Sequence, residues 1–206
     1  MRFLLLLFVI FASIPVENVQ AQSHVPIDWR TRIIEPSGYT ELCKREPEYC
    51  KKTRGNLSVR YTNKVRAQLE LINRDVNEGI EYVSDEIRHG TPDLWERSVH
   101  HGDCEEYALR KRDLLLAMGG YPPGALVFGW VIDTTRGRRI PHLVLVVKTS
   151  KADFILDNLR PFPYEWHASN HVWVAIQASD NPRIWYAVDD RRIDLRKEKL
   201  AEKQKK

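Results

Sequence analysis

Five short β-type runs follow one another through the second half of the chain, with only turns between them. They cover residues 125–133, 142–148, 154–159, 171–178 and 183–188. Connections this short favour an antiparallel sheet, because parallel strands need a long crossover. Helical patterns precede these runs in the chain. Helices first and consecutive strands second predict an α+β fold, with N-terminal helices packed on an antiparallel β-sheet.

Two stretches have the period of a helix. Between residues 58 and 79, apolar side chains recur every three or four positions, which predicts an amphipathic helix with a structural role. These apolar side chains are Val65, Leu69, Ile72, Val76 and, just beyond, Ile80. A second helix is predicted to start at Cys104 and to stop at Gly119 and Gly120, because Pro122 and Pro123 follow them.

Residues 22–55 and 84–101 show no sustained period. The first segment is polar and has prolines at positions 26, 36 and 47, so we expect an extended lead-in that wraps the core. The second contains Gly90-Thr91-Pro92 and is expected to be a loop-rich approach to the second helix.

The N-terminus has the pattern of a secretory signal peptide. Met1-Arg2 is followed by an apolar run over residues 3–14 and by the small-residue site Val19-Gln20-Ala21, which predicts cleavage after Ala21. An uncleaved anchor is the alternative, but the apolar run is shorter than the ~20 residues that span a bilayer. We therefore expect a periplasmic or secreted protein with no transmembrane anchor after cleavage.

A chain of 206 residues without a break in composition is expected to form one folded domain. The predicted organisation is a signal peptide over 1–21, a domain over 22–188 and a charged C-terminal tail over 189–206. The formal net charge is +4, and the tail mixes cations with anions. A modest charge of mixed sign on an exported chain argues against nucleic acid as a partner.

The chain has three cysteines, and two of them are close in sequence. Cys43 and Cys50 are predicted to form a small disulfide loop, as is common in exported proteins. Two free thiols or half of a metal site are the alternatives, but no nearby cysteine or histidine completes four ligands. Cys104 is then left as a thiol that is free to react.

Cys104 is predicted to occupy the first position of its helix, directly after the N-capping residue Asp103. Glu106, three residues after Asp103, completes the pattern of a capping box. The partial positive charge at a helix N-terminus favours the thiolate, whereas the neighbouring carboxylates oppose it. A cysteine in this setting needs a base to complete its activation.

Seven histidines are candidates for that base. They are His24, His89, His100, His101, His142, His167 and His171. Only His142 opens a strongly apolar strand, from which an imidazole could reach a helix terminus packed beside the sheet. Asp157 lies in the next apolar run, where a buried carboxylate needs a partner, and His142 is the natural one. His100 and His101 are rival bases, closer to Cys104 in sequence but without an obvious orienting carboxylate other than Asp103.

These residues suggest a catalytic triad. Cys104 would attack a carbonyl carbon and form a thioester, His142 would take up and return the proton, and Asp157 would hold the imidazole. The backbone N–H of Cys104 is a candidate oxyanion donor, and the indole N–H of Trp95 is a second one. For Trp95, plain packing is the alternative. Taken singly, each triad residue also has an ordinary structural explanation, and only their combination favours catalysis.

Around these residues the chain resembles the bacterial transglutaminase-like cysteine peptidases, a papain-like group with cysteine, histidine and aspartate in that order. The resemblance extends from about Cys43 to Val188. It rests on the segments 72–77, 102–108 with Lys111-Arg112, 142–145 and 156–159. The triad of the family corresponds to Cys104, His142 and Asp157. A papain-like, transglutaminase-like fold is therefore expected.

The family is also similar to periplasmic proteases that release large surface adhesins, some of which depend on calcium. The resemblance implies that Asp103, Glu105 and Glu106 are the acids that could bind calcium. However, Glu106 stands where those proteases typically have Asp, and Pro122-Pro123 stands where they supply another oxygen. Because calcium takes six to eight oxygens, we expect no required cofactor, and capping and solvation as the role of these acids.

The leading hypothesis is a periplasmic cysteine endopeptidase that cleaves an exported or surface protein, such as an adhesin. A transglutaminase-type acyl transferase is the first alternative, because the same thioester can react with an amine. A catalytically silent module that binds peptides or regulates a partner is the second, because folds can outlive their chemistry.

Overall fold

The computed structural model describes residues 27, 29–135 and 137–190. The predicted signal peptide over 1–21 and the first residues of the predicted domain lie outside the described residues. Of the predicted charged tail, only Asp189 and Asp190 are described. Within these residues, no helix combines the length and the apolar character needed to cross a membrane.

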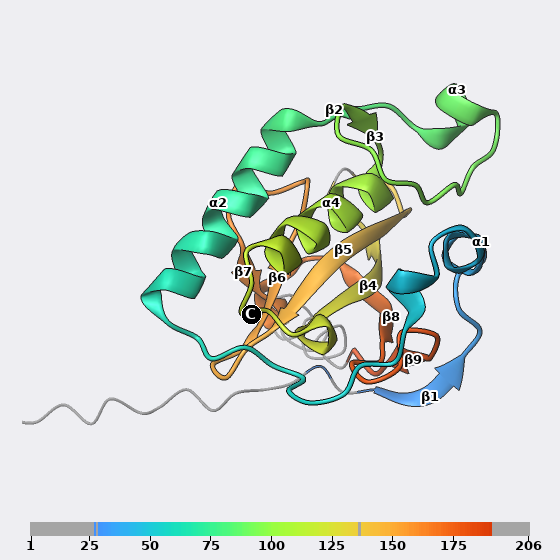
Figure 1. Ribbon diagram of the computed structural model, residues 1–206. Coiled ribbons are helices and arrows are strands. Elements are labelled where there is room, and N and C mark those ends of the chain that lie inside the picture. The colour runs from blue at the N-terminus through green and yellow to red at the C-terminus, as the bar shows by residue number, and fades with distance from the viewer. Residues whose placement is uncertain (1–26, 28, 136, 191–206) are drawn as a thin grey trace, which may run out of the picture.

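A seven-stranded antiparallel sheet forms the centre of the molecule (Figure 1). Its strands lie in the order β1-β9-β8-β4-β5-β6-β7. Their bounds are β1 (Trp29–Ile33), β4 (Leu126–Asp133), β5 (Ile140–Lys148), β6 (Asp153–Leu156), β7 (Tyr164–Glu165), β8 (Val172–Gln177) and β9 (Trp185–Val188). Every neighbouring pair is antiparallel. The α+β fold with an antiparallel sheet is therefore confirmed.

Residues 143–147 of strand β5 are all apolar because both faces of the strand are buried there. Leu143, Leu145 and Val147 point into the core beneath the helices, whereas Val144 and Val146 point into a second core on the opposite face. Side chains alternate between the two faces of a strand, so burial on both sides removes the usual polar alternation. The strand that carries His142 thus lies inside the sheet, between β4 and β6, with both faces covered.

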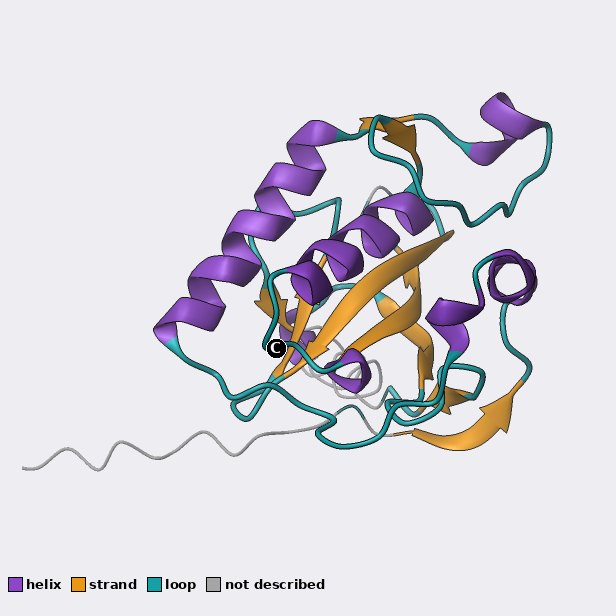
Figure 2. Ribbon diagram, viewed as in Figure 1, coloured by secondary structure: helices purple, strands orange, loops and turns teal. Residues whose placement is uncertain are grey.

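Two long helices cover one face of the sheet (Figure 2). Helix α2 (Asn63–Gly79) packs beside α4 (Cys104–Ala117), and α4 also contacts β5. Both helices were predicted. The first starts later than expected, because the Oγ1 of Thr62 caps it by accepting the N–H of Val65 at 3.2 Å. The second ends before Gly119 and Gly120, whose φ angles of 72° and 80° are readily adopted by glycine.

The expectation of an extended lead-in over residues 22–55 is wrong for its described part. This part contains strand β1, helix α1 (Ser37–Arg45) and the 3₁₀ helix η1 (Pro47–Cys50). The apolar side of α1 is only about one turn long, too short to give a visible period. Strand β1 forms by pairing with β9, about 150 residues further along the chain, which no local pattern reveals.

Helix α1 is fixed to the core mainly by Tyr39. Its ring makes edge contacts with Trp95, Phe128 and Trp185, at centroid distances of 5.4, 6.2 and 5.7 Å. Aromatic pairs in this geometry stabilise a core beyond the apolar area that they bury. The N-terminal segment is therefore part of the core and does not simply wrap around it.

The segment over 84–101 is mostly irregular, as expected, but it contains the short helix α3 (Asp85–His89). It is bounded by strands β2 (Glu81–Tyr82) and β3 (His101–Gly102), which form a separate parallel pair. Two further 3₁₀ helices, η2 (Pro123–Ala125) and η3 (Trp166–Ala168), complete the described elements. Strand β3 leads directly into α4 and so sets the position of Cys104.

Candidate active site

Cys104 is the first residue of α4, and the predicted capping box is present. Oε2 of Glu106 accepts the backbone N–H of Asp103 at 2.9 Å. Gly102 permits this fold-back, because a Cβ at this position would lie 2.5 Å from the Cβ of Glu106. The chain therefore turns sharply into the helix and presents the Cys104 side chain at its N-terminus.

The surroundings of the Cys104 thiol favour its neutral form. Sγ donates a hydrogen bond to Oε2 of Glu105 at 2.9 Å. Burial raises the pKa of Cys104 well above its usual range, and Glu105 and Asp103 raise it further. A hydrogen bond from the backbone N–H of Leu143 acts in the opposite direction. The opposing effect of the acids, anticipated from the sequence, is therefore reinforced by burial.

His142 projects from β5, where it is paired with Val131 of β4. The strand begins at Ile140, two residues earlier than expected. The imidazole is buried, and its Nε2 lies 2.9 Å from Oδ1 of Asp157. An N–H at Nε2 satisfies the carboxylate and leaves Nδ1 as the nitrogen that can accept a proton.

Asp157 is the first residue after β6, not a residue inside the strand as the sequence suggested. It is 1% exposed. Burial alone would raise the pKa of this carboxyl, but hydrogen bonds from His142 and His171 outweigh burial and hold it well below its usual range. The carboxylate is therefore ionised and fully paired, as a buried acid requires.

Helix α2 holds the loop that carries Asp157. Oδ1 of Asn73 accepts the N–H of Asp157 at 3.0 Å, and its Nδ2 donates to the carbonyls of Arg160 and Pro161. Nδ2 of Asn77 donates to the carbonyls of Asp157 and Arg160 at 2.9 and 3.0 Å. The segment 72–77 carries part of the family resemblance, but no pattern in it predicted this role for the two asparagines.

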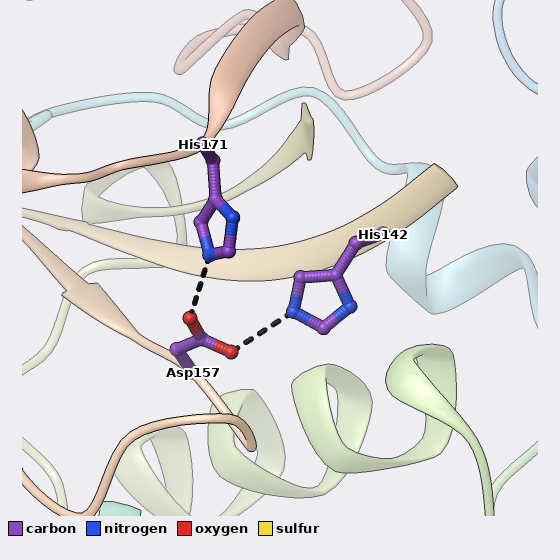
Figure 3. A group of neighbouring side chains, drawn as sticks. All are labelled: His142, Asp157 and His171. Atoms are coloured by element: carbon purple, nitrogen blue, oxygen red, sulfur yellow. Dashed lines mark hydrogen bonds and ion pairs between the residues drawn. The ribbon is translucent and has the colours of Figure 1, made fainter. Parts of the chain in front are cut away.

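His171 and Tyr164 also contact Asp157, a role that the sequence did not predict for either residue. Nε2 of His171 and the hydroxyl of Tyr164 each lie 2.9 Å from Oδ2 (the histidine contact is drawn in Figure 3). His171 was one of seven histidines, and it precedes an apolar strand much as His142 opens one. Its position directly before the apolar run of β8 was the sequence signal that could have identified His171.

Cys104 and His142 line the same two cavities. The larger has a volume of about 450 Å³ and is also lined by Trp95 and Trp130. The smaller, of about 300 Å³, is also lined by Asn158. Cys104 therefore lies where the two cavities meet, a place that an extended ligand could reach from both sides.

Trp95, His100 and His101, the other residues suggested for the reaction, do not have the surroundings that their suggested roles need. Trp95 is buried, and its Nε1 donates to Oδ1 of Asp93 at 2.8 Å, so this arrangement does not leave the indole N–H for an oxyanion. The exposed imidazole of His101 lies 3.4 Å from a carboxylate oxygen of Glu81. His100 is exposed as well, and neither histidine lines the two cavities.

The three acids named as calcium candidates do not act together. Side-chain atoms of Asp103, Cys104 and Glu105 lie within 4.8 Å of one another, as metal ligands would. Glu106 instead belongs to a second such group, with Asp85 and Asp103, and its two carboxylate oxygens accept the N–H groups of Glu96 and Asp103. Burial raises the pKa of Glu106 to about 8. Glu106 is therefore a structural residue, whereas Asp103 and Glu105 share one side of the thiol.

Cys43 and Cys50 form a disulfide, the pairing that the sequence favoured. It joins the end region of α1 to the last residue of η1. Cys104 remains a free thiol in the described part of the chain.

Cys104, at the start of a helix, and His142, on a strand of the antiparallel sheet that this helix covers, thus line the same cavities. The model of the bacterial transglutaminase-like cysteine proteinase family matches residues 30–193, and the chain belongs to this family. A search of curated proteins gives no match. A peptidase of this family acts on a protein substrate.

Solved structures of Legionella pneumophila LapG are similar to this chain. The calcium-bound form is 26% identical, with a TM-score of 0.51, and the match covers 72% of this chain and 87% of that chain. Another LapG structure is also 26% identical, with a TM-score of 0.49 and coverage of 63% of this chain and 73% of that chain. The first of these matches supports the transglutaminase-like fold.

Proposed function

We propose that this protein is a periplasmic endopeptidase that cleaves an exported or surface protein, such as an adhesin, through a Cys104–His142–Asp157 triad. The observation that carries the proposal is the buried hydrogen bond between Nε2 of His142 and Oδ1 of Asp157. It holds the imidazole in a cavity wall that also contains Cys104.

In the proposed reaction, Nδ1 of His142 accepts the thiol proton while Sγ of Cys104 attacks the carbonyl carbon of the scissile peptide bond. The backbone N–H of Cys104, which has no partner within its helix, donates to the developing oxyanion. His142 then returns the proton to the leaving amine, and a thioester remains. Water attacks the thioester, again with His142 as base, and releases the acid and the free thiol.

An extended polypeptide is the substrate form that suits the two cavities. They meet at Cys104 and share Tyr82, Pro141 and His142 in their walls. The larger one adds the aromatic surfaces of Trp95 and Trp130, which suit apolar side chains. A chain that enters both cavities would place one peptide bond beside Sγ.

We also propose that Asp103 and Glu105 bind a calcium ion. Oδ1 of Asp103 has no hydrogen-bond partner among the described residues, although it is buried. Burial raises the pKa of Glu105 well above its usual range, and the neighbouring Asp103 raises it further. Two carboxylate groups suit a hard cation, with water supplying the other oxygens. A calcium ion supplies charge that offsets both acids, and the calcium-bound form of LapG supports this proposal.

Iodoacetamide alkylation of Cys104, followed by mass spectrometry across a range of pH, tests the triad. We expect the wild type to react near neutral pH, and His142→Ala to react about a hundredfold more slowly, the lower end of what a general base contributes. Asp157→Asn should also react more slowly. Equal rates in all three proteins would overturn the triad and favour a silent binding module.

Cleavage itself is tested with surface proteins of the source cells. New N-termini should appear with the wild type and be absent with Cys104→Ala. A labelled primary amine added to the same reaction distinguishes the two chemistries, because an acyl transferase would incorporate it. New N-termini with Cys104→Ala would show that this thiol is not the nucleophile.

The calcium proposal is tested by thermal unfolding with added calcium or with a chelator. Calcium should raise the melting temperature of the wild type, since a ligand that binds only the folded state stabilises it. It should have no such effect on Glu105→Gln. The same shift in both proteins, or in neither, would contradict the assignment of Glu105 as a ligand.

A further inference from the structure

The carboxylate of Asp157 is bound by more donors than a catalytic triad requires. Oδ1 lies 2.9 Å from Nε2 of His142 and accepts the N–H of Leu159 at 2.9 Å. Oδ2 accepts the hydroxyl of Tyr164 and lies 2.9 Å from Nε2 of His171. An ionised carboxylate has about four lone-pair sites. All of them are used, and each oxygen has its own histidine.

The two imidazoles approach Asp157 from different parts of the sheet (Figure 3). His142 belongs to β5, next to β6, whereas His171 directly precedes β8, which lies on the far side of β4. The ring centroids are 5.4 Å apart. His171 is buried, and its Nδ1 lies 3.5 Å from Oδ1 of Asp133 at the end of β4. His171 therefore bridges two carboxylates in the interior.

We infer that His171 is a positioning residue for the proposed reaction: it holds Oδ2 of Asp157 so that Oδ1 stays on His142. This inference rests on the proposed triad. The terminal torsion of an aspartate is broad, so a carboxylate held only on one side can turn. If Oδ1 turned away, Nε2 of His142 would lose its acceptor. The imidazole could then place its proton on Nδ1, where it blocks uptake of the thiol proton.

Several charged or titratable groups surround this pair and act together with His171. Asp133 faces it from β4, His142 from β5 and Tyr164 from β7. Lys111 of α4 interacts electrostatically with Asp157. Since His171 also touches Asp133, a change at His171 removes a partner from each carboxylate. The test must therefore keep the hydrogen bond to Asp157 in one variant and remove it in another.

Three variants meet this need. His171→Gln places an amide N–H near the position of Nε2 and can still donate to Oδ2, whereas His171→Leu fills the space without a donor. His167→Leu is the control, because this exposed histidine lies near in sequence but contacts Glu165 instead. Each protein is kept in excess calcium, and thermal unfolding verifies that it is folded.

The first measurement is nitrogen NMR of the protein with labelled histidines. We expect His142 to carry its proton on Nε2 in the wild type, in His171→Gln and in His167→Leu. In His171→Leu, signals of both tautomers should appear. A residue with a purely structural role would lower the melting temperature and leave the tautomer of His142 unchanged, which would overturn the inference.

The second measurement is the rate of Cys104 alkylation by iodoacetamide near neutral pH. His171→Leu should react about tenfold more slowly, the effect expected for the loss of one hydrogen bond to a charged group. His171→Gln should stay within about threefold of the wild type. Slow alkylation in His142→Ala together with a wild-type rate in His171→Leu would refute only the inference about His171. A wild-type rate of alkylation in His142→Ala would refute the proposed triad as well.

Discussion

At the scale of the residue, Cys104 is subject to opposing electrostatic effects. A helix N-terminus carries about half a positive charge, which favours the thiolate. Glu105 accepts the thiol hydrogen bond and, with Asp103, raises the pKa of Cys104, which burial has already raised. Burial, Glu105 and Asp103 all act against this partial positive charge. Burial and the acids beside the thiol, more than its helix position, therefore favour the protonated form of Cys104.

Replacement of Glu105 by Gln should lower the pKa of Cys104. The amide removes a negative charge next to Sγ and keeps the size of the side chain, so the thiolate forms more readily. In calcium-free buffer, we expect alkylation near neutral pH to be about tenfold faster, equal to a shift of about one pKa unit. Glu86→Gln, which removes an exposed carboxylate from α3, is the control. An unchanged rate of Cys104 alkylation in Glu105→Gln would contradict this explanation.

At the scale of the element, α2 does more than cover the sheet. Its apolar side packs on the core, as the period of Val65, Leu69, Ile72 and Val76 predicted. Asn73 lies on the same side, is fully buried and binds the loop after β6. A buried asparagine interrupts the apolar pattern only where its amide has partners. This helix therefore connects the core to the position of Asp157.

Asn73→Ala should destabilise the protein by about 2 to 3 kcal/mol. The change leaves the N–H of Asp157 and the carbonyl of Pro161 without the Asn73 amide, while the carbonyl of Arg160 keeps its hydrogen bond from Asn77. Urea unfolding measures the loss, and slower alkylation of Cys104 should accompany it. Asp75→Asn on the exposed side of the same helix is the control and should change neither quantity. Full stability in Asn73→Ala would show that the loop holds its position without α2.

Helix α4 carries a buried cation seven residues after Cys104. Lys111 is 1% exposed, and its Nζ lies 5.9 Å from the centroid of the Tyr107 ring. Burial lowers the pKa of Lys111 to about 7, although Asp157 raises it in part. Below pH 7 the folded protein must hold a buried charge that the unfolded chain exposes to water, which costs stability. The cost falls as the pH rises from about 7 towards the ordinary lysine pKa.

Lys111→Met should therefore be more stable than the wild type in mildly acidic solution. We expect a gain of about 2 to 4 kcal/mol in the free energy of unfolding, below the limit set by a shift of more than three pKa units. The difference should shrink as the pH rises above 7, because the wild-type lysine then loses its proton in the folded state. Urea unfolding at several pH values tests this. A stability difference that does not vary with pH would mean that the pKa of Lys111 is not lowered in the folded protein.

At the scale of the whole molecule, the N-terminal segment and the sheet depend on each other. Strand β1 extends the sheet next to β9, and α1 places Tyr39 against three aromatic side chains of the core. Pro36 and Ser37, at the start of α1, line the larger cavity. One wall of the candidate site is therefore built by residues more than sixty positions before Cys104.

Removal of the disulfide by Cys43→Ala and Cys50→Ala should cost about 2 kcal/mol of stability, the value for a loop of this short length. Neither cysteine lines the two cavities at Cys104. We therefore expect a lower melting temperature with an unchanged rate of Cys104 alkylation. A large change in that rate would mean that the disulfide also holds the wall formed by Pro36 and Ser37.

Local patterns were enough to predict much of this protein. The period of α2, the capping box of α4 and the five β-type runs depend on residues close in sequence, so the class of fold and the residues of the proposed triad followed from them. The partner of His142 followed too, because consecutive antiparallel strands are neighbours.

The tertiary structure alone decided the contacts between distant segments. His171 reaches Asp157 because the sheet order brings β8 close to β4 and β5, and Asn73 reaches the same residue because α2 packs over the loop after β6. Likewise, β1 exists only through its pairing with β9. Such contacts join residues 14 to about 150 positions apart, and their energy depends on how the elements pack. A periodic pattern records which side of an element is buried, but not which side chains meet there.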